Sequence, residues 1–131
     1  MAIKYHYLKV RDAKDVVVAE FIQSSILDET AIDRVGKEFE QLVLEAATAK
    51  KLLLNFQAIE YMSSAMIGKL ILLNKNCKQA KIKFKVCNVS GNILEVFQIM
   101  KIGKVIEIHK DEKSALDTFS GPSISRWLGL G

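Results

Sequence analysis

The sequence predicts an α/β fold: a single domain with a mixed, mostly parallel sheet, an opening antiparallel hairpin and about four packed helices. After the first two strands, apolar segments alternate with stretches of helical periodicity, an order that favours parallel strands joined by right-handed crossovers. The run Leu52–Leu54 is apolar at every position, which is typical of a central strand covered on both faces. With 131 residues, 50% of them hydrophobic, the chain can build one core but not two ordinary domains. We therefore expect a domain over residues 1–120 and a C-terminal tail over residues 121–131.

The first half of the chain is expected to contain two strands, a loop and a long helix before the central strand. Lys4–Val10 and Val16–Phe21 are rich in apolar and β-branched residues, and the polar residues between them fit a hairpin connection. A loop follows up to Asp28. Apolar residues then recur at three- and four-residue spacings over Ile32–Ala46, which predicts a helix capped by Asp28 or Thr30.

The second half continues the alternation of helix and strand. The predicted elements are a helix from Ser63 to Ala80, a strand over Lys81–Cys87, a short helix over Ile93–Met100, a strand over Val105–Ile108 and a last helix from Asp111. Lysines alternate with apolar residues in Lys81–Cys87, which predicts one face toward the core and one toward solvent. Gly121 and Pro122 are expected to stop the last helix. In the tail, Trp127 is expected to pack onto the domain or onto a partner.

Two adjacent serines mark the most informative position in the chain. Ser63 lies where the second long helix should begin, so its hydroxyl can accept a hydrogen bond from a first-turn amide. Ser64 follows in the first turn, where free N–H groups favour a negative group. Simple helix capping is the alternative interpretation of this serine pair. The carboxyl end of a central strand is where open α/β sheets usually carry their sites, however, and Gly68 interrupts a helix of good helix formers, which indicates close approach by another group.

Lysine residues are dense along this helix and the following strand. The formal net charge is +4 and the pI about 9.1, and the lysines in question are Lys69, Lys75, Lys78, Lys81, Lys83 and Lys85. A solvated face is the simpler interpretation. The alternative is a basic module that binds nucleic acid, an acidic protein or an anionic membrane surface. Base recognition is not expected, because arginines and exposed aromatic residues do not accompany these lysines.

Catalysis, cofactors and metals are not expected. His6 and His109 are far apart, without a nucleophile or metal ligands at useful spacing, and no glycine-rich phosphate loop follows a strand. Cys77 and Cys87 lack metal or redox spacing and are expected to be reduced core residues. The apolar runs are too short to span a membrane, and the first residues do not have the architecture of a signal peptide. The expected location is the cytoplasm.

Two long blocks of sequence carry a family resemblance. The first is LLLNFQAIEYMSSAMIGKLILL, residues 52–73, and the second is KIKFKVCNVSGNILEVFQIMKIGKVIEIHKDEKSALDTF, residues 81–119. The first resembles the strand, serine-bearing turn and helix of the STAS domains, whose simplest members are bacterial anti-sigma factor antagonists, and the second is similar to the later half of those domains. The resemblance extends from about Lys4 to Phe119 and implies the STAS fold and a regulatory role without catalysis.

The resemblance also implies specific residue roles. The family's turn often reads Asp-Ser-Ser-Gly, and its first serine is phosphorylated by a partner kinase that is also an anti-sigma factor. In an ungapped alignment Ser64 takes the phosphorylated position, and Gly68 takes that of a later glycine. Ser63, Ala65 and Met66 replace the aspartate, the second serine and the first glycine. The implied partners are an anti-sigma factor or serine kinase and a matching phosphatase, with contacts at Asp28, Ser63, Met66 and Gly68. A phosphorylation-independent adaptor is the alternative.

Overall fold

The computed structural model describes the backbone of residues 5–127 and the side chains as far as residue 120. Its elements, in chain order, are β1 (Leu8–Ala13), β2 (Val16–Phe21), β3 (Ser25–Ile26), α1 (Glu29–Glu45), β4 (Lys51–Asn55), β5 (Tyr61–Met62), α2 (Ser64–Gln79), β6 (Lys83–Cys87), α3 (Gly91–Ile99), the 3-10 helix η1 (Ile102–Lys104), β7 (Glu107–His109) and α4 (Glu112–Trp127). Among the described residues, no helix combines the length and the apolar character that crossing a membrane would require.

The main sheet has five strands in the order β1-β2-β4-β6-β7. β1 and β2 form an antiparallel hairpin, while β2, β4, β6 and β7 run parallel. β4 lies at the centre, and the side chains of Leu52, Leu53 and Leu54 are all 0% exposed. The predicted fold class is therefore confirmed, including the hairpin and the central strand buried on both faces.

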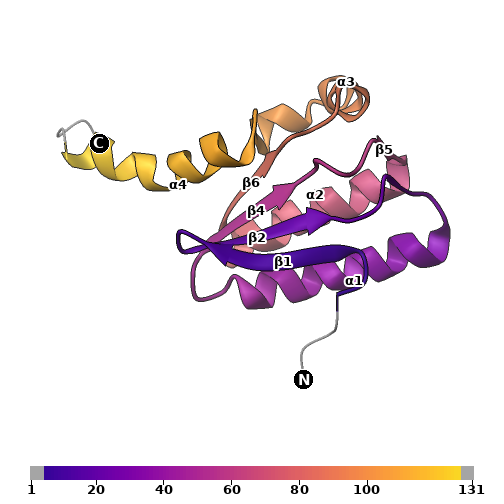
Figure 1. Cartoon of the computed structure of the whole chain (residues 1–131), viewed down its shortest axis with the longest axis horizontal. Coiled ribbons are helices and arrows are strands. Elements are labelled where there is room, and N and C mark those ends of the chain that lie inside the picture. The colour runs from indigo at the N-terminus through magenta and orange to yellow at the C-terminus, as the bar shows by residue number, and fades with distance from the viewer. Residues whose placement is uncertain (1–4, 128–131) are drawn as a thin grey trace.

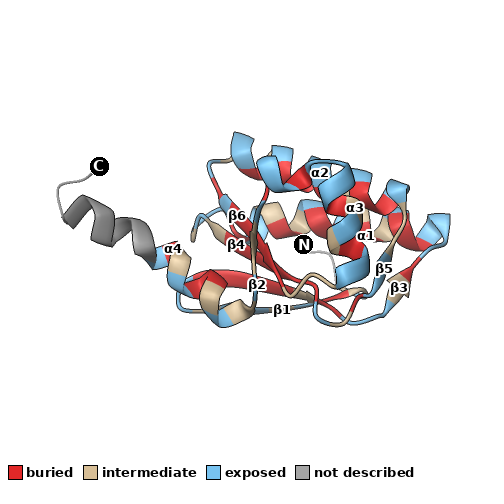
Figure 2. Ribbon diagram, turned by 90° about the horizontal axis from the view of Figure 1, so that it is seen from above, coloured by how far each residue is buried: buried red, intermediate tan, exposed pale blue. Residues whose placement is uncertain are grey.

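Helices cover the two faces of the sheet unequally (Figure 1). α1 and α2 pack side by side over one face, and the largest core lies beneath them, as the buried positions in Figure 2 show. Three edge-to-face ring pairs run through this core, linking Phe21 to Phe39, Phe21 to Phe56, and Phe56 to Phe97, with centroids 5.2–6.2 Å apart. α4 covers the other face over a second, smaller core formed by Val16, Val18, Leu53, Cys87, Ala115, Leu116 and Phe119.

The solvent-facing side predicted for Lys81–Cys87 is wrong at one position. Lys85 is only 7% exposed, because α4 packs over this part of β6. Its ammonium donates to the hydroxyl of Thr118 at 2.7 Å, pairs with the carboxylate of Glu107 at 3.0 Å and lies 4.6 Å from the ring centroid of Phe119. The long lysine stem packs against apolar atoms while the charge finds polar partners at the side of the helix.

The start of β1 also differs from the prediction, and the cause is a buried carboxylate. Glu38 on α1 is 0% exposed, and its two oxygens accept the backbone amides of His6 and Tyr7 at 3.0 Å each. Arg34, one turn earlier, donates to the same carboxylate at 3.1 Å. These amides therefore bond to a side chain instead of a strand, and the ladder begins at Leu8 rather than at Lys4, which lies outside the described residues.

The last helix does not stop at the predicted position. α4 continues through Gly121 and Pro122 to Trp127. A glycine costs a helix about 1 kcal/mol and a proline about 3 kcal/mol, so both weaken the helix without necessarily ending it. The predicted packing of Trp127 concerns a side chain outside the described ones.

Candidate functional site

A second, two-stranded sheet brings two helix starts together. β3 and β5 pair in parallel, with Ser25 opposite Tyr61 and Ile26 opposite Met62. The chain leaves β3 into α1 and leaves β5 into α2, so the two helices begin at neighbouring positions of one edge of the molecule. The sequence predicts a loop here, so this sheet was not expected. A strand of two residues has no periodic pattern, and its pairing depends on backbone hydrogen bonds that any sequence can make.

Each of the two helices has a side-chain cap at its start. Asp28 accepts the amide of Ala31 at 2.9 Å at the start of α1, and Ser63 accepts the amide of Met66 at 3.2 Å at the start of α2. Asp28 is therefore the predicted cap that α1 uses. Because the hydroxyl of Ser63 is engaged in capping, it holds the first turn of α2 in place.

Ser64 has the exposed hydroxyl of the serine pair. It is the first residue of α2 and is exposed to solvent. No side-chain hydrogen bond joins Ser64 to any residue that the structure describes. Its position at the start of a sixteen-residue helix places it next to amide groups that have no partner within the helix. The structure therefore separates the two serines: one caps the helix, and the other faces solvent.

A groove of about 660 Å³ lies between the two helix starts. Its lining residues are Leu27, Glu29, Ile32 and Asp33 on the α1 side and Ser63, Ala65, Gly68, Lys69 and Leu72 on the α2 side. Two of its apolar residues are well exposed, Leu27 at 64% and Leu72 at 46%. At Gly68, an added Cβ would meet no atom within 4 Å. Nothing within the described domain therefore approaches this glycine, and the space beside it is open.

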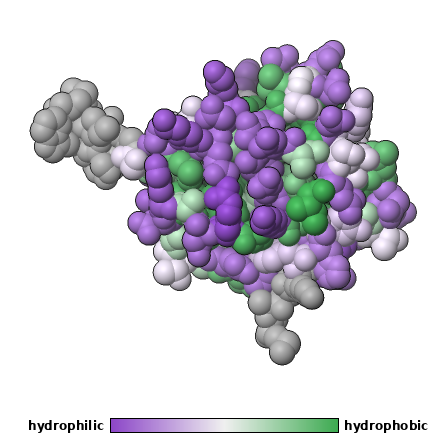
Figure 3. All heavy atoms as spheres, viewed as in Figure 1, coloured by the Kyte–Doolittle hydropathy of each residue, from purple (hydrophilic) through white to green (hydrophobic). Residues whose placement is uncertain are grey.

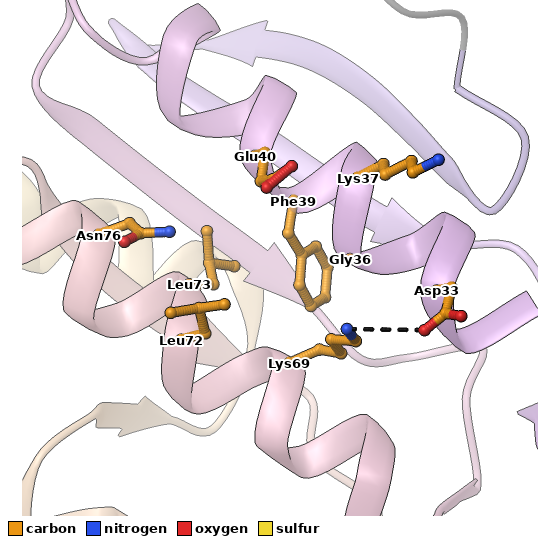
Figure 4. A pocket seen from close by; sticks show the side chains of 9 residues that line it. All are labelled: Asp33, Gly36, Lys37, Phe39, Glu40, Lys69, Leu72, Leu73 and Asn76. Atoms are coloured by element: carbon orange, nitrogen blue, oxygen red, sulfur yellow. Dashed lines mark ion pairs between the residues drawn. The ribbon is translucent and has the colours of Figure 1, made fainter. Parts of the chain in front are cut away.

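Lys69 crosses from α2 to α1 along this groove (Figure 4). Its ammonium lies 3.7 Å from a carboxylate oxygen of Asp33. A Cβ added at Gly36 of α1 would lie 3.0 Å from Cδ of Lys69, so the glycine makes room for the crossing side chain. Beyond Lys69 the groove continues as a second pocket of about 310 Å³, whose lining includes Gly36, Phe39 and Leu73. The sequence predicts a solvated or basic face for Lys69, and no local pattern indicates this ion pair.

The predicted contact residues are not equally accessible. Asp28 and Gly68 are exposed, and Ser63 is half-buried with its hydroxyl engaged. Met66 was expected to contact a partner, but its side chain is 0% exposed. It lies on the same stripe of α2 as Leu70 and Leu73 and packs into the core, so the side chain does not reach the surface of the described domain. Only the backbone amide of Met66 takes part in the site, by bonding to Ser63.

A second polar cluster lies at the carboxyl end of β4. Asn55 is 3% exposed; it accepts the amide of Gln57 at 2.8 Å and donates to the carboxylate of Glu112 at 3.2 Å. Arg11 on β1 pairs with the same carboxylate. The hydrogen bond from Arg11, aided by that from Asn55, lowers the pKa of Glu112 despite the opposing effect of burial. These contacts attach the first turn of α4 to the sheet.

Metal ligands, thiols and histidines are the other candidate reactive groups among the described residues. No group of three or more His, Cys, Asp or Glu side chains among them is placed to hold a metal ion. Burial raises the pKa of both Cys77 and Cys87 to about 12, so both thiols remain protonated at neutral pH. His6 is exposed, whereas His109 is half-buried and lies beside Glu107 and Thr118.

Comparison with known proteins gives one family and several solved structures. The STAS domain model matches residues 7–115, whereas no protein with a curated description matches this chain. An anti-sigma-factor antagonist (STAS) domain protein from Planctomyces limnophilus is 22% identical, with a TM-score of 0.69, over 85% of this chain and 95% of that chain. An anti-sigma factor antagonist from Mycobacterium paratuberculosis is 15% identical, with a TM-score of 0.74, over 85% and 91%.

The phosphorylated form of SpoIIAA, a Bacillus cell fate determinant, is 17% identical, with a TM-score of 0.63, and the match covers 86% of this chain and 98% of that chain. At such identities the three structures establish the fold alone. The family model, however, spans both sheets, α1 to α3 and the first turn of α4. The chain therefore belongs to the STAS domain family and has the fold of the anti-sigma factor antagonists.

Proposed function

We propose that this protein is an anti-sigma factor antagonist-like regulator whose binding to an anti-sigma factor or serine kinase is switched off by phosphorylation at Ser64. The observation that carries the proposal is the exposed Ser64 at the start of α2, next to an open groove with exposed apolar residues. Among the similar folds is SpoIIAA in a phosphorylated form. A matching phosphatase would restore binding, and the protein itself would not act as an enzyme.

The position of Ser64 suits a phosphate that leaves the fold intact. A phosphoserine carries a charge of about −1.5 to −2 at neutral pH. At a helix start, free amides and the positive end of the helix dipole stabilise such a charge. The first turn of α2 contains no acidic residue that would repel it. We therefore expect modification to change the surface of the domain and to leave its packing unchanged.

The surroundings of Ser64 explain how a phosphate would prevent docking. Glu29 and Asp33 already make the α1 side of the groove acidic, and the ammonium of Lys69 already pairs with Asp33. A partner that packs against Leu27 and Leu72 must remove water from the neighbouring surface. Removing water from the doubly charged phosphate costs free energy unless the partner supplies a cationic side chain to pair with it. The phosphorylated surface would therefore bind the partner poorly.

The proposal is tested by capture experiments with four baits: the wild type, Ser64→Ala, Ser64→Asp and Ser120→Asp. Ser120 is an exposed serine on α4 and therefore controls for an added charge elsewhere. The wild type, Ser64→Ala and Ser120→Asp are expected to capture an anti-sigma factor or serine kinase from native cytosol, whereas Ser64→Asp loses it. Mass spectrometry of the wild-type bait, incubated with ATP and the captured kinase, is expected to find phosphate on Ser64.

Two results would contradict the proposal. If all four baits captured the same protein equally, the chain would be a phosphorylation-independent adaptor. If the captured kinase modified a serine other than Ser64, the switch would be assigned to the wrong residue.

A further inference from the structure

Six lysines gather at the edge where the parallel strands begin. β2, β4 and β6 run parallel, so their first residues share one edge, opposite the edge where α1 and α2 begin (Figure 1). The turns and strand starts of this edge, together with the last turn of α2, carry Lys14, Lys50, Lys51, Lys78, Lys81 and Lys83, which we call the lysine edge. Three acidic residues lie among or beside these lysines: Asp15 in the hairpin turn, Glu45 at the end of α1, and Glu107, which lines one pocket together with Lys78 and Lys83.

Three of these lysines occupy backbone conformations that do not favour lysine. Lys14, Lys50 and Lys81 have φ values of 52°, 62° and 61°, in the left-handed region where glycine and asparagine are preferred. Each lies in the turn just before a parallel strand. A non-glycine residue in this region typically costs a protein on the order of 1 kcal/mol. Folding alone would favour glycine or asparagine at all three turns.

The lysine edge also contains an unfavourable charge pair. Lys51 and Lys83 are register partners on the adjacent strands β4 and β6, so two like charges lie side by side. Such pairs destabilise a sheet. None of the six lysines forms an ion pair with a residue that the structure describes; the ammonium of Lys50 donates to the carbonyl of Ala80 at 3.0 Å. The edge therefore keeps an excess of positive charge over the nearby Asp15, Glu45 and Glu107.

Exposed aliphatic side chains accompany the lysines. Leu44, in the last turn of α1, is 69% exposed, and Val105, just after η1, is 49% exposed. Val105 lines a shallow pocket of about 380 Å³ together with Lys78, Lys83 and the acidic Glu107. On the face seen in Figure 3, hydrophilic residues predominate and hydrophobic ones form small separate patches. The lysine edge thus combines concentrated positive charge with isolated aliphatic side chains.

We infer that the lysine edge binds the surface of an anionic phospholipid bilayer. Lysines near such a surface each contribute about 1 kcal/mol, and exposed aliphatic side chains can enter the headgroup region. Nucleic acid fits less well, because the edge has neither arginines for bidentate phosphate contacts nor exposed aromatic residues among the described side chains. This inference is independent of the proposed function: Ser64 lies at the opposite edge and remains accessible when the lysine edge is bound.

The test is sedimentation of the full chain with vesicles made of equal parts of phosphatidylcholine and phosphatidylglycerol, compared with vesicles of phosphatidylcholine alone. The double variant Lys51→Gln/Lys83→Gln is expected to partition roughly 30-fold less onto the anionic vesicles. The control variant Lys110→Gln/Lys113→Gln removes the same charge beside the start of α4, at the other edge, and should bind like the wild type. Binding should weaken as salt is added and should be absent with phosphatidylcholine alone.

A second measurement separates binding from folding. Because Lys51→Gln/Lys83→Gln removes a like-charge pair, its melting temperature should equal or exceed that of the wild type while vesicle binding falls. Lys81→Asn, which suits the left-handed turn, should behave in the same way. No binding of the wild type to anionic vesicles, or an equal loss in the control variant, would overturn the inference. If duplex DNA displaced the protein from the vesicles, and if DNA binding were lost in Lys51→Gln/Lys83→Gln, the lysine edge would be a nucleic-acid-binding surface instead.

Discussion

At the scale of single residues, the site depends on two neighbouring serines with different contacts. The hydroxyl of Ser63 accepts the amide of Met66, whereas Ser64 is exposed at the first position of the same helix. Ser63 stands where the turns of the family often have an aspartate, and its hydroxyl caps α2 without carrying a charge. Capping depends on an acceptor oxygen, which both side chains provide.

We predict that the two serines contribute differently to stability. Ser63→Ala should lower the free energy of unfolding by about 1 kcal/mol, because the first turn of α2 loses its cap. Ser64→Ala should change it by less than about 0.5 kcal/mol, as expected for an exposed side chain without a partner. Urea unfolding of both variants measures the difference. A larger loss for Ser64→Ala than for Ser63→Ala would mean that the two roles are reversed.

Two helical glycines give a second matched pair. An alanine at Gly68 meets open space, so Gly68→Ala should stabilise the protein by up to about 1 kcal/mol through helix propensity. The same change at Gly36 brings a Cβ to 3.0 Å from Lys69, which must move away from Asp33, so its gain should be smaller or absent. Thermal unfolding compares the two. If Gly68 contributes to partner docking, Gly68→Ala should be more stable than the wild type but should capture less of the partner. Capture equal to or stronger than that of the wild type would exclude this contribution.

At the scale of elements, α4 is attached to the sheet by different contacts at its first turn and along its middle. Its first turn is bound through Glu112 to Arg11 and Asn55, and its middle packs on the second core and on Lys85. The lowered pKa of Glu112 means that the folded state favours the carboxylate over the acid. Stability from this contact is therefore present above the ordinary pKa of 4.5 and lost as the pH falls through the lower folded-state value.

We predict that Glu112→Gln destabilises the protein at neutral pH and that the difference disappears in acid. An ion pair of this exposure contributes at most about 1 kcal/mol, and the hydrogen bonds to Asn55 and Arg11 weaken when the carboxylate loses its charge. Urea unfolding at pH values on both sides of 4.5 measures the effect. A difference that persisted unchanged in acid would show that packing, and not charge, attaches the first turn of α4.

The elements also show which parts of this fold a sequence can reveal. α1, α2, β2 and β4 have long periodic or continuous apolar patterns, and the structure contains all four close to their expected bounds. β3 and β5 pair through the backbone groups of only two residues each, so no side-chain pattern predicts these strands. Lys85 and Glu38 are buried by segments far away in the sequence, α4 and residues 6–7. The serine pair was locatable from local signals, whereas the groove beside it depends on β3 and β5 and was not.

At the scale of the whole molecule, two opposite edges differ in charge. The edge where α1 and α2 begin includes Asp28, Glu29 and Asp33. The opposite edge, where the parallel strands begin, is the lysine edge. Because β2, β4 and β6 run parallel, all their starts lie on one side of the sheet and all their ends on the other, and this keeps the two groups of charged residues apart. The +4 net charge of the chain therefore understates how strongly its two edges differ.

We predict that the two edges act independently, so that Ser64→Asp leaves vesicle binding within about twofold of the wild type. β4 alone has five residues, and at about 3.3 Å per residue the edges lie more than one Debye length apart at physiological ionic strength. Screening at that distance leaves little interaction between a charge at Ser64 and the lysine edge. The measurement is sedimentation of both proteins with the anionic vesicles at physiological salt, with Lys51→Gln/Lys83→Gln as the variant that must lose binding. A strong loss in Ser64→Asp would mean that modification at the helix start is transmitted through the sheet, because direct electrostatics between the edges cannot account for it.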